Sequence, residues 1–392
     1  MNEWHLASGY RFAGIASGLR SEPDRRDLAV IISDAPAAAA GVFTQNRVCA
    51  APVQVSRARL PRADARAIVV CSGNANACTG EQGLRDARRM TELVADELQC
   101  SPEQVLVAST GVIGRPLPMP ILEAGIPQAI RAATTGRDAF SHAAHAILTT
   151  DTGTKVATRR CGAITLTGFA KGAAMIGPNL ATMLGFILTD AAVHPSDLQR
   201  ILKIAAEQSF NCISVEGHTS TNDSVFLLAN GSGPRLAGAE LEALALEVRH
   251  VCVELARKII IDAEGAEHII TIEVDGCRTD ADARQIAKTI AESALVKTAV
   301  FGNDPNWGRV VSAAGYSGVA FEEKDLSLWM GDMPLYRAGT PLPFDSAAAS
   351  SYLKHNREVH FKLRFTLGTG RCTFYTSDLT YEYVKLNADY TT

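Results

Sequence analysis

Residues 171–184 read KGAAMIGPNLATML, a stretch in which a turn containing glycine and proline leads directly into an apolar strand. The Gly-Pro-Asn triplet at 177–179 is typical of a turn, and Thr182 stands at the start of the strand expected over residues 183–188. Threonine is common in strands, so Thr182 could be an ordinary strand residue. The alternative is that a strained turn presses the Thr182 hydroxyl against the carbonyl carbon of Ala181. Attack there would move the acyl group from nitrogen to oxygen, and water would then cleave the ester.

Cleavage of this kind would leave a threonine whose free α-amine lies beside its own hydroxyl. An α-amine has a pKa of about 7.7–8.0, so it can accept a proton near neutral pH. A hydroxyl and a base on one residue make an activated nucleophile. The stretch therefore predicts either an ordinary strand or an N-terminal nucleophile.

Outside this stretch, short aliphatic runs alternate with amphipathic segments. Strands are expected at residues 67–71, 104–108, 183–188, 268–274 and 358–366, and helices at 81–99, 120–133, 138–148, 195–210, 238–262 and 280–295. Residues 358–366 alternate in the manner of a half-buried antiparallel strand, residues 109–116 are expected to form a turn, and Ser196 and Asp197 to cap their helix. Interspersed helices and strands predict an α/β fold, an α+β layered sandwich of helices and mixed sheets.

The 392 residues include 47% hydrophobic and 20% charged side chains, with a net charge of −4. These values are typical of globular proteins, and without a basic stripe nucleic acid is not an expected partner. No run approaches the ~18 apolar residues of a membrane span, and the first ten residues lack a signal-peptide pattern. The nine cysteines include no C-x-x-C pair, which indicates reduced thiols. We therefore expect a cytoplasmic protein with no nucleic-acid or membrane partner.

Several cofactor and catalytic motifs do not occur in the sequence. It has no G-x-x-x-x-G-K-[ST] phosphate loop and no G-x-S-x-G elbow, and residues 231–234 (GSGP) fall short of a dinucleotide loop. His142 and His145 are spaced as H-x-x-H, whereas a zinc helix needs two histidines four residues apart with an acid between them. We expect these histidines on a helix surface, and neither a metal nor a resident cofactor.

Six further motifs accompany the opening stretch in a fixed order along the chain. They are SGNANACTG at 72–80, STGVIG at 109–114, TTDT at 149–152, STND at 220–223, GNDPNWGR at 302–309 and NADYTT at 387–392. With these motifs the chain, from about residue 5 to 392, resembles the ornithine acetyltransferases, also called glutamate N-acetyltransferases or the ArgJ family. The resemblance implies the ArgJ/DmpA-like fold.

The resemblance also implies cleavage between Ala181 and Thr182. An α chain of residues 1–181 and a β chain of residues 182–392 would then share one core and assemble as an α2β2 heterotetramer. The implied activity belongs to arginine biosynthesis and is a ping-pong reaction. Thr182 takes the acetyl group from N2-acetylornithine and releases ornithine, and glutamate then accepts the acetyl group to give N-acetylglutamate.

Further site residues follow from the matching motif positions. The resemblance implies that the Thr110 hydroxyl and the Gly111 N–H bind the oxyanion. Charge complementarity suits Lys171 to the substrate carboxylate and Glu264 to the ornithine ammonium. The residues expected to bind substrate are Thr149 (or Thr150 in the alternative register), Lys171, Thr182, Glu264, Asn387 and Thr392.

Several alternatives stay open from the sequence alone. Residues 216–219 read EGHT where the family more often has an Asp-Gly-Asp pattern, and His218 is either a loop residue or an additional acid or base. Acetyl-CoA is a possible second acetyl donor, if the enzyme is bifunctional. The other functions considered are a self-cleaving aminopeptidase or amidohydrolase of related fold, an acetyltransferase paralogue of secondary metabolism, and an uncleaved binding protein.

Overall fold

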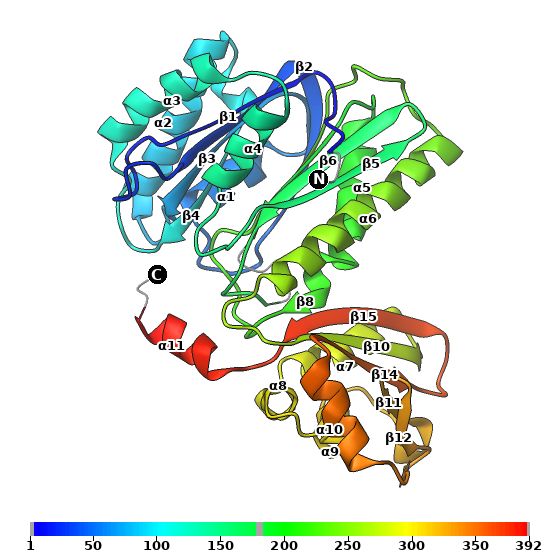
Figure 1. Cartoon of the computed structure of the whole chain (residues 1–392). Coiled ribbons are helices and arrows are strands. Elements are labelled where there is room, and N and C mark those ends of the chain that lie inside the picture. Colours follow the sequence, from blue (N-terminus) through cyan, green and yellow to red (C-terminus); the bar gives the residue numbers. More distant parts are fainter. Residues whose placement is uncertain (1–3, 178–182, 390–392) are drawn as a thin grey trace.

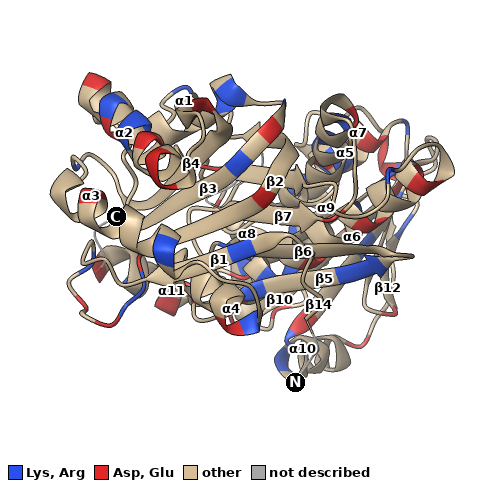
Figure 2. Cartoon of the chain, turned by 90° about the horizontal axis from the view of Figure 1, so that it is seen from above, with Lys and Arg blue, Asp and Glu red and all other residues tan. Residues whose placement is uncertain are grey.

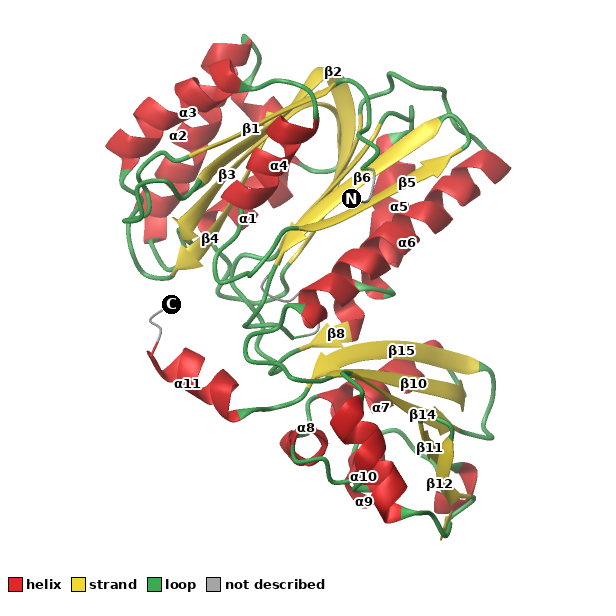
Figure 3. Cartoon of the chain, in the orientation of Figure 1, coloured by secondary structure: helices red, strands yellow, loops and turns green. Residues whose placement is uncertain are grey.

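The computed structural model describes residues 4–177 and 183–389. Two β-sheets organise these residues, and helices cover the sheets (Figures 1 and 3). Three residues of the expected site, Ala181, Thr182 and Thr392, lie outside the described residues.

The first sheet has eight strands in the order β4-β3-β2-β9-β7-β6-β5, with β1 paired to β2. The strands are β1 (Tyr10–Ile15), β2 (Leu28–Phe43), β3 (Arg62–Asn74), β4 (Val105–Val112), β5 (Lys155–Cys161), β6 (Ile164–Lys171), β7 (Leu184–Thr189) and β9 (Ser224–Ala229). Strand β7 pairs antiparallel with β6 and parallel with β9. Strands from both sides of residues 178–182 therefore form one continuous sheet.

The long strand β2 connects the two halves of this sheet. Its register with β3 shifts between Ile32 and Ala37. Beyond that shift Ala37 and Ala39 still pair with β3, while residues 38–43 pair with β9 on the other edge of β2. In Figure 3 the two groups of strands meet at β2 and diverge from it. Alternate residues of β2 face opposite sides, so that Ala29 and Ile31 enter one buried cluster and Val30 and Ile32 another.

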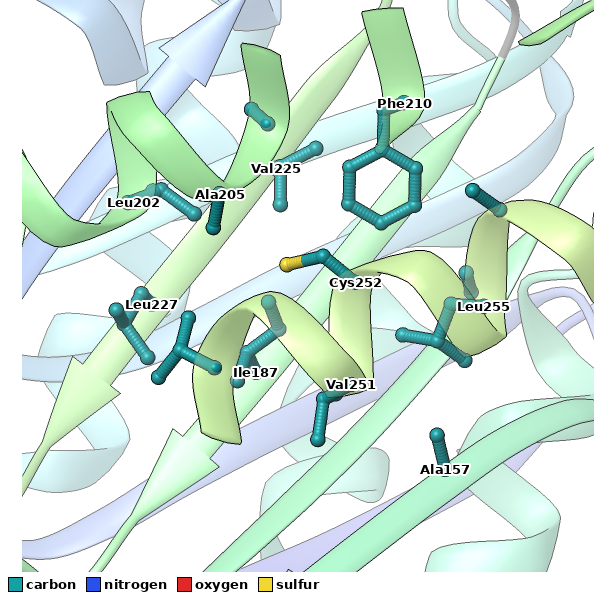
Figure 4. Packing of buried hydrophobic residues seen from close by; sticks show 14 of the residues in the cluster. Ala157, Ile187, Leu202, Ala205, Phe210, Val225, Leu227, Val251, Cys252 and Leu255 are labelled. Atoms are coloured by element: carbon teal, nitrogen blue, oxygen red, sulfur yellow. The ribbon is translucent and has the colours of Figure 1, made fainter. Parts of the chain in front are cut away.

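Six helices cover the first sheet. They are α1 (Ala51–Arg59), α2 (Gly80–Leu98), α3 (Met119–Ala132), α4 (Arg137–Ala146), α5 (Pro195–Glu207) and α6 (Ala239–Ile261). Helices α1 to α3 pack against β1 to β4, and α4 packs against β1 and β2. Helix α5 packs against β2 and β9, and α6 packs against β5 and β6. Figure 4 shows Cys252 of α6 among Ala205, Phe210 and Val225. This cluster is mainly aliphatic, whereas the cluster between β1, β2, β6, β7, β9 and α4 includes the contacting rings of Phe12, Phe140, Phe169, Phe186 and Phe226.

The second sheet has seven strands in the order β13-β12-β11-β14-β10-β15-β8. They are β8 (Ile213–Ser214), β10 (Ile269–Cys277), β11 (Ser327–Met330), β12 (Met333–Arg337), β13 (Thr340–Pro341), β14 (Glu358–Arg364) and β15 (Gly370–Ser377). The helices of this half are α7 (Asp280–Ala291), α8 (Ala294–Phe301), α9 (Trp307–Gly315) and α10 (Ser346–His355), and α11 (Tyr381–Asp389) follows the last strand. Helices α7 to α10 share a second buried core with this sheet.

Most expected elements form, and the α/β fold class is confirmed. Three local predictions are wrong, and a fourth, on β14, is confirmed only in part. Strand β14 is half-buried as expected, yet it runs parallel to β10 and antiparallel only to β11. The expected helix at 280–295 is two helices, because the Ser293 side chain caps α8. His194, not Ser196 or Asp197, caps α5. Residues 109–112 belong to β4 and not to a turn.

Lys and Arg positions are interspersed with Asp and Glu positions along the ribbon in Figure 2. All nine cysteines are free thiols. Among residues 4–177 and 183–389, no helix is both long enough and apolar enough to cross a membrane.

Candidate active site

One pocket, with a cavity volume of about 110 Å³, collects the expected site residues that the structure describes. It lies where the ends of β4 and β6 meet the loop after α6 and helix α11. Its lining includes Thr110, Gly111, Thr149, Thr150, Lys171, Glu264 and Asn387. These residues are separated by up to 277 positions in sequence, and the fold brings all seven to one place.

Gly111 occupies a backbone conformation that favours glycine. Its φ angle is +134°, and it pairs with Gly73 across the parallel strands β3 and β4. A Cβ atom at this position would lie 2.2 Å from the carbonyl carbon of Gly73. Only glycine therefore allows the two backbones to approach this closely beside the pocket.

We expect Gly111→Ala to lose both stability and any activity that depends on this backbone, because the new methyl group must displace β3. The backbone strain alone costs on the order of 1–3 kcal/mol. Gly114→Ala is the matched control, since Gly114 also has a positive φ but no atom within 4 Å of its ideal Cβ position. Thermal unfolding of both variants measures the difference, and equal melting temperatures would contradict this account.

Lys171, the last residue of β6, brings a buried positive charge into the pocket. Its side chain is only 2% exposed, and its Nζ donates a hydrogen bond of 3.2 Å to Thr110 Oγ1. Burial lowers the pKa of Lys171, and the nearby carboxylate of Asp151 opposes that shift. The cation thus lies directly beside one of the two expected oxyanion donors.

Asp151 organises the wall of the pocket behind Lys171. Its Oδ1 accepts hydrogen bonds from Lys155 Nζ and from the Gly172 N–H, both 2.6 Å, and its Oδ2 accepts one of 3.0 Å from the Thr149 N–H. Lys155 also pairs with Asp262, two residues before Glu264. Asp151 belongs to the TTDT motif at 149–152, but nothing in that motif shows these distant partners.

The pKa of Asp151 is lowered in the folded protein, and this shift stabilises the fold at neutral pH. Burial alone would raise this pKa, but Lys171 and Lys155 outweigh burial and hold it at about 2, against an ordinary value of 3.8. The ionised carboxylate therefore stabilises the fold above pH ~4, and that contribution is lost as the pH falls towards 2. A shift of this size corresponds to roughly 2 kcal/mol.

We expect Asp151→Asn to lower the free energy of unfolding at pH 7 and to weaken its fall between pH 4 and pH 2. Urea titrations across this range measure both effects. Asp34→Asn is the control, because Asp34 forms an exposed ion pair with Arg11 that is worth at most about 1 kcal/mol. If the free energy of unfolding of Asp151→Asn falls between pH 4 and pH 2 as much as that of the wild type, the Asp151 carboxylate does not stabilise the fold.

Glu264 and Asn387 form the opposite side of the pocket. Asn387 of α11 donates a hydrogen bond of 3.2 Å from Nδ2 to Glu264 Oε2. The Glu264 N–H donates to the Ala173 carbonyl at 3.0 Å, so the loop after α6 is joined to the chain just beyond Lys171. A carboxylate and a buried ammonium thus face the same small cavity from different elements.

The STND motif also lines the pocket, through Ser220, Thr221 and Asn222. Asp223 is fully buried, and its Oδ1 accepts a hydrogen bond of 3.1 Å from the Met183 N–H at the start of β7. Burial raises the pKa of Asp223. The motif was one of those that carried the family resemblance, yet no residue in it was predicted to take part in the site.

The segment that departs from the family pattern lies next to the pocket but does not line it. Burial raises the pKa of Glu216 to about 7, and burial likewise lowers the pKa of Lys297 nearby to about 8. His218 is exposed and is not a lining residue, which favours its interpretation as a loop residue.

In the described part of the chain, no group of three or more His, Cys, Asp or Glu side chains is arranged to hold a metal ion. His142 and His145 both lie on α4, and His145 Nδ1 lies 2.7 Å from the Ser141 carbonyl oxygen of the preceding turn. The lining of the pocket offers hydroxyl, ammonium and carboxylate groups.

Comparison with known proteins agrees with these observations. The family model described as the ArgJ family matches residues 11–392. The arginine biosynthesis bifunctional protein ArgJ of Geobacter sulfurreducens is 46% identical over 98% of this chain and 99% of its own length. ArgJ 1 of Nostoc sp., of the same description, is 48% identical over 98% and 96%.

A solved structure is also similar. The crystal structure of the arginine biosynthesis bifunctional protein ArgJ from Bacillus halodurans aligns with a TM-score of 0.52 and 36% identity, and covers 53% of this chain and 100% of that one. The matches over nearly the whole length of the chain confirm the family resemblance seen in the motifs. This chain belongs to the ArgJ family of arginine-biosynthesis enzymes.

Proposed function

We propose that this protein transfers an acetyl group from N2-acetylornithine to glutamate, through an acetyl ester on Thr182, after the chain has cleaved itself between Ala181 and Thr182. The observation that carries this proposal is the pocket in which Lys171, Thr110 and Gly111 lie opposite Glu264. A buried cation, oxyanion donors and an anion in one small cavity suit an acylated diamino acid.

The reaction would proceed in two half-reactions. The Thr182 hydroxyl oxygen attacks the acetyl carbonyl carbon while the free α-amine of Thr182 accepts the hydroxyl proton. The oxyanion that forms would be stabilised by Thr110 and Gly111, each donor of this kind being worth about 2.7–4 kcal/mol. When the C–N bond breaks, the α-amine of ornithine receives that proton and leaves. The neutral amine of glutamate then attacks the ester carbonyl carbon, and the C–O bond to Thr182 breaks. One amine proton passes through the α-amine of Thr182 to its side-chain oxygen, which gives N-acetylglutamate and regenerates the hydroxyl.

The charges of the pocket match the charges of the substrate. Lys171 would bind the α-carboxylate, and Glu264, held by Asn387, would bind the ammonium group of the ornithine side chain. Glutamate carries a carboxylate at that position. We therefore expect it to bind more weakly beside Glu264, as suits an acceptor that enters after ornithine has left.

The length of the solved Bacillus halodurans chain agrees with self-cleavage of this protein. The solved Bacillus halodurans chain aligns over all of its residues but corresponds to 53% of this chain. A cut after residue 181 of 392 would give a second piece of 54% of the chain. This agreement supports two separate chains, residues 1–181 and 182–392, which we propose assemble as α2β2 in the cytoplasm.

Acetyl-CoA is proposed as a second acetyl donor. The support is the word "bifunctional" in the names of the full-length relatives. With acetyl-CoA the same ester on Thr182 would form, and the thiol of coenzyme A would leave in place of ornithine.

The direct test incubates purified protein with glutamate and either N2-acetylornithine or acetyl-CoA, and follows N-acetylglutamate by mass spectrometry. Transfer from N2-acetylornithine is expected, and transfer from both donors would establish bifunctionality. Release of ornithine without N-acetylglutamate would instead indicate an amidohydrolase. A single band of full length on a denaturing gel, with no activity, would indicate an uncleaved binding protein.

A further inference from the structure

Asn222 connects two segments that the proposed reaction needs to hold in place. Its side chain is buried, and its Nδ2 donates hydrogen bonds of 2.6 Å to the Ala75 carbonyl and 2.9 Å to the Ser109 carbonyl. Its Oδ1 accepts a hydrogen bond of 2.6 Å from Thr221 Oγ1. Both hydrogens of the amide and its oxygen are therefore engaged, as a buried polar group requires.

The two carbonyl partners lie immediately behind the expected oxyanion donors. The Ser109 carbonyl belongs to the same peptide group as the nitrogen of Thr110, and Ala75 follows the end of β3, the strand that pairs with Gly111. Ser109 Oγ also donates to the Ala75 carbonyl at 2.6 Å. Asn222 thus clamps the last residues of β4 to the loop after β3.

The residue after Asn222 extends this connection to the other side of the site. Asp223 accepts the Met183 N–H, and that nitrogen is covalently bonded to the carbonyl carbon of residue 182. Asn222 therefore bonds to the segment that contains the expected oxyanion donors. Its neighbour Asp223 bonds to Met183, the first described residue after Thr182.

We propose that Asn222 is a positioning residue for acyl transfer, which holds Thr110 and Gly111 at the distance from the start of β7 that the oxyanion requires. This inference rests on the proposed function, since it assumes an oxyanion at Thr110 and Gly111. Asn222 acts through Ser109 and Ala75. Hydrogen-bond donation, more than side-chain volume, is what the position demands, because both partners are carbonyl oxygens.

The test compares Asn222→Asp and Asn222→Ala with the wild type. Aspartate has nearly the same shape, but its carboxylate oxygen would face two carbonyl oxygens in place of the amide hydrogens. We expect kcat for ornithine release from N2-acetylornithine to fall about 10- to 100-fold in both variants, with KM within about twofold. Rates are expressed per cleaved chain, and circular dichroism and the melting temperature show whether each variant is folded.

Asn230→Ala is the matched control. Asn230 follows the opposite end of β9, is 5% exposed where Asn222 is 6% exposed, and also donates from Nδ2 to a distant carbonyl, that of Ser8, at 2.7 Å. It is expected to lose stability but to keep kcat. If Asn222 had a purely structural role, Asn222→Ala and Asn230→Ala would both lower stability and leave kcat unchanged.

A double-mutant cycle with Thr110→Ala identifies the route of the effect. If Asn222 acts through the oxyanion donors, its replacement costs much less kcat when Thr110 is already alanine. Full additivity, or a wild-type kcat in folded Asn222→Asp or Asn222→Ala, would overturn the proposal.

The assay separates this proposal from the proposed function. The step that releases ornithine is the same whether glutamate or water later accepts the acetyl group. The rate of ornithine release is therefore measured with and without glutamate. A wild type that releases ornithine but transfers the acetyl group only to water, with no N-acetylglutamate formed, would overturn the transferase function. The comparison of the asparagine variants would still decide the role of Asn222. A wild type that releases none would overturn both.

Discussion

Thr182→Ala is expected to purify as one uncut chain of 392 residues and to transfer no acetyl group. Alanine removes the hydroxyl that would attack the carbonyl of Ala181, so neither the cleavage nor the ester can form. Removing the nucleophile of an enzyme of this kind lowers kcat by as much as about 10⁶-fold. A denaturing gel, intact-mass measurement and the acetyl-transfer assay check the three parts of the expectation.

Two further variants make this result specific. Thr182→Ser keeps a hydroxyl and is expected to retain cleavage and part of the activity. Thr189→Ala, which changes a buried threonine at the other end of β7, is expected to be cleaved normally. Turnover by a pure Thr182→Ala preparation would show that another residue is the nucleophile.

Lys171→Met is expected to lower kcat/KM for N2-acetylornithine by about 30-fold to several thousand-fold. Methionine has a similar length but no charge, so the substrate carboxylate would enter a buried pocket without its partner. Loss of one member of a buried charge pair costs about 2–5 kcal/mol. Thr110 would also lose the hydrogen bond from Lys171, so part of the loss is expected in kcat.

Lys297→Met is the matched control for this prediction. Lys297 is 3% exposed where Lys171 is 2% exposed, and its Nζ donates to Thr376 Oγ1 at 3.0 Å, but it does not line the pocket. We expect it to lower stability and to leave kcat/KM nearly unchanged. Equal losses of kcat/KM in the two variants would show that burial of a lysine, and not substrate binding, is what matters.

Sequence reasoning could identify the pocket residues that lie within short motifs. Thr110, Gly111, Lys171 and Asn387 lie in the quoted motifs, and Glu264 lies in the stretch DAEGA at 262–266. All five were expected in one site, and the fold brings them to one pocket. The roles proposed for them stay predictions, as do those of Ala181, Thr182 and Thr392. The α/β class was also predictable, because the aliphatic runs and amphipathic segments alternate clearly.

What the sequence could not show depends on contacts between distant residues. Asp151 has its pKa set by Lys155 and Lys171, and Asn222 bonds to residues more than 100 positions away. Contacts between distant residues also explain why a local pattern gave a wrong prediction at residues 109–116. The glycines of residues 109–116 suggested a turn, but pairing with β3 extends β4 through Val112, since backbone hydrogen bonds to a neighbouring strand outweigh local preference.

The place of β7 in the sheet has a consequence for how a cleaved molecule would come apart. Strand β7 is hydrogen-bonded to β6 along Leu166 to Lys171 on one side and to β9 on the other. After a cut between Ala181 and Thr182, the β6–β7 ladder and the β2–β9 ladder would join the two polypeptides within this sheet. Unfolding would then also be a dissociation, so that the stability of the mature protein would rise with its concentration, although the uncut precursor obeys no such dependence.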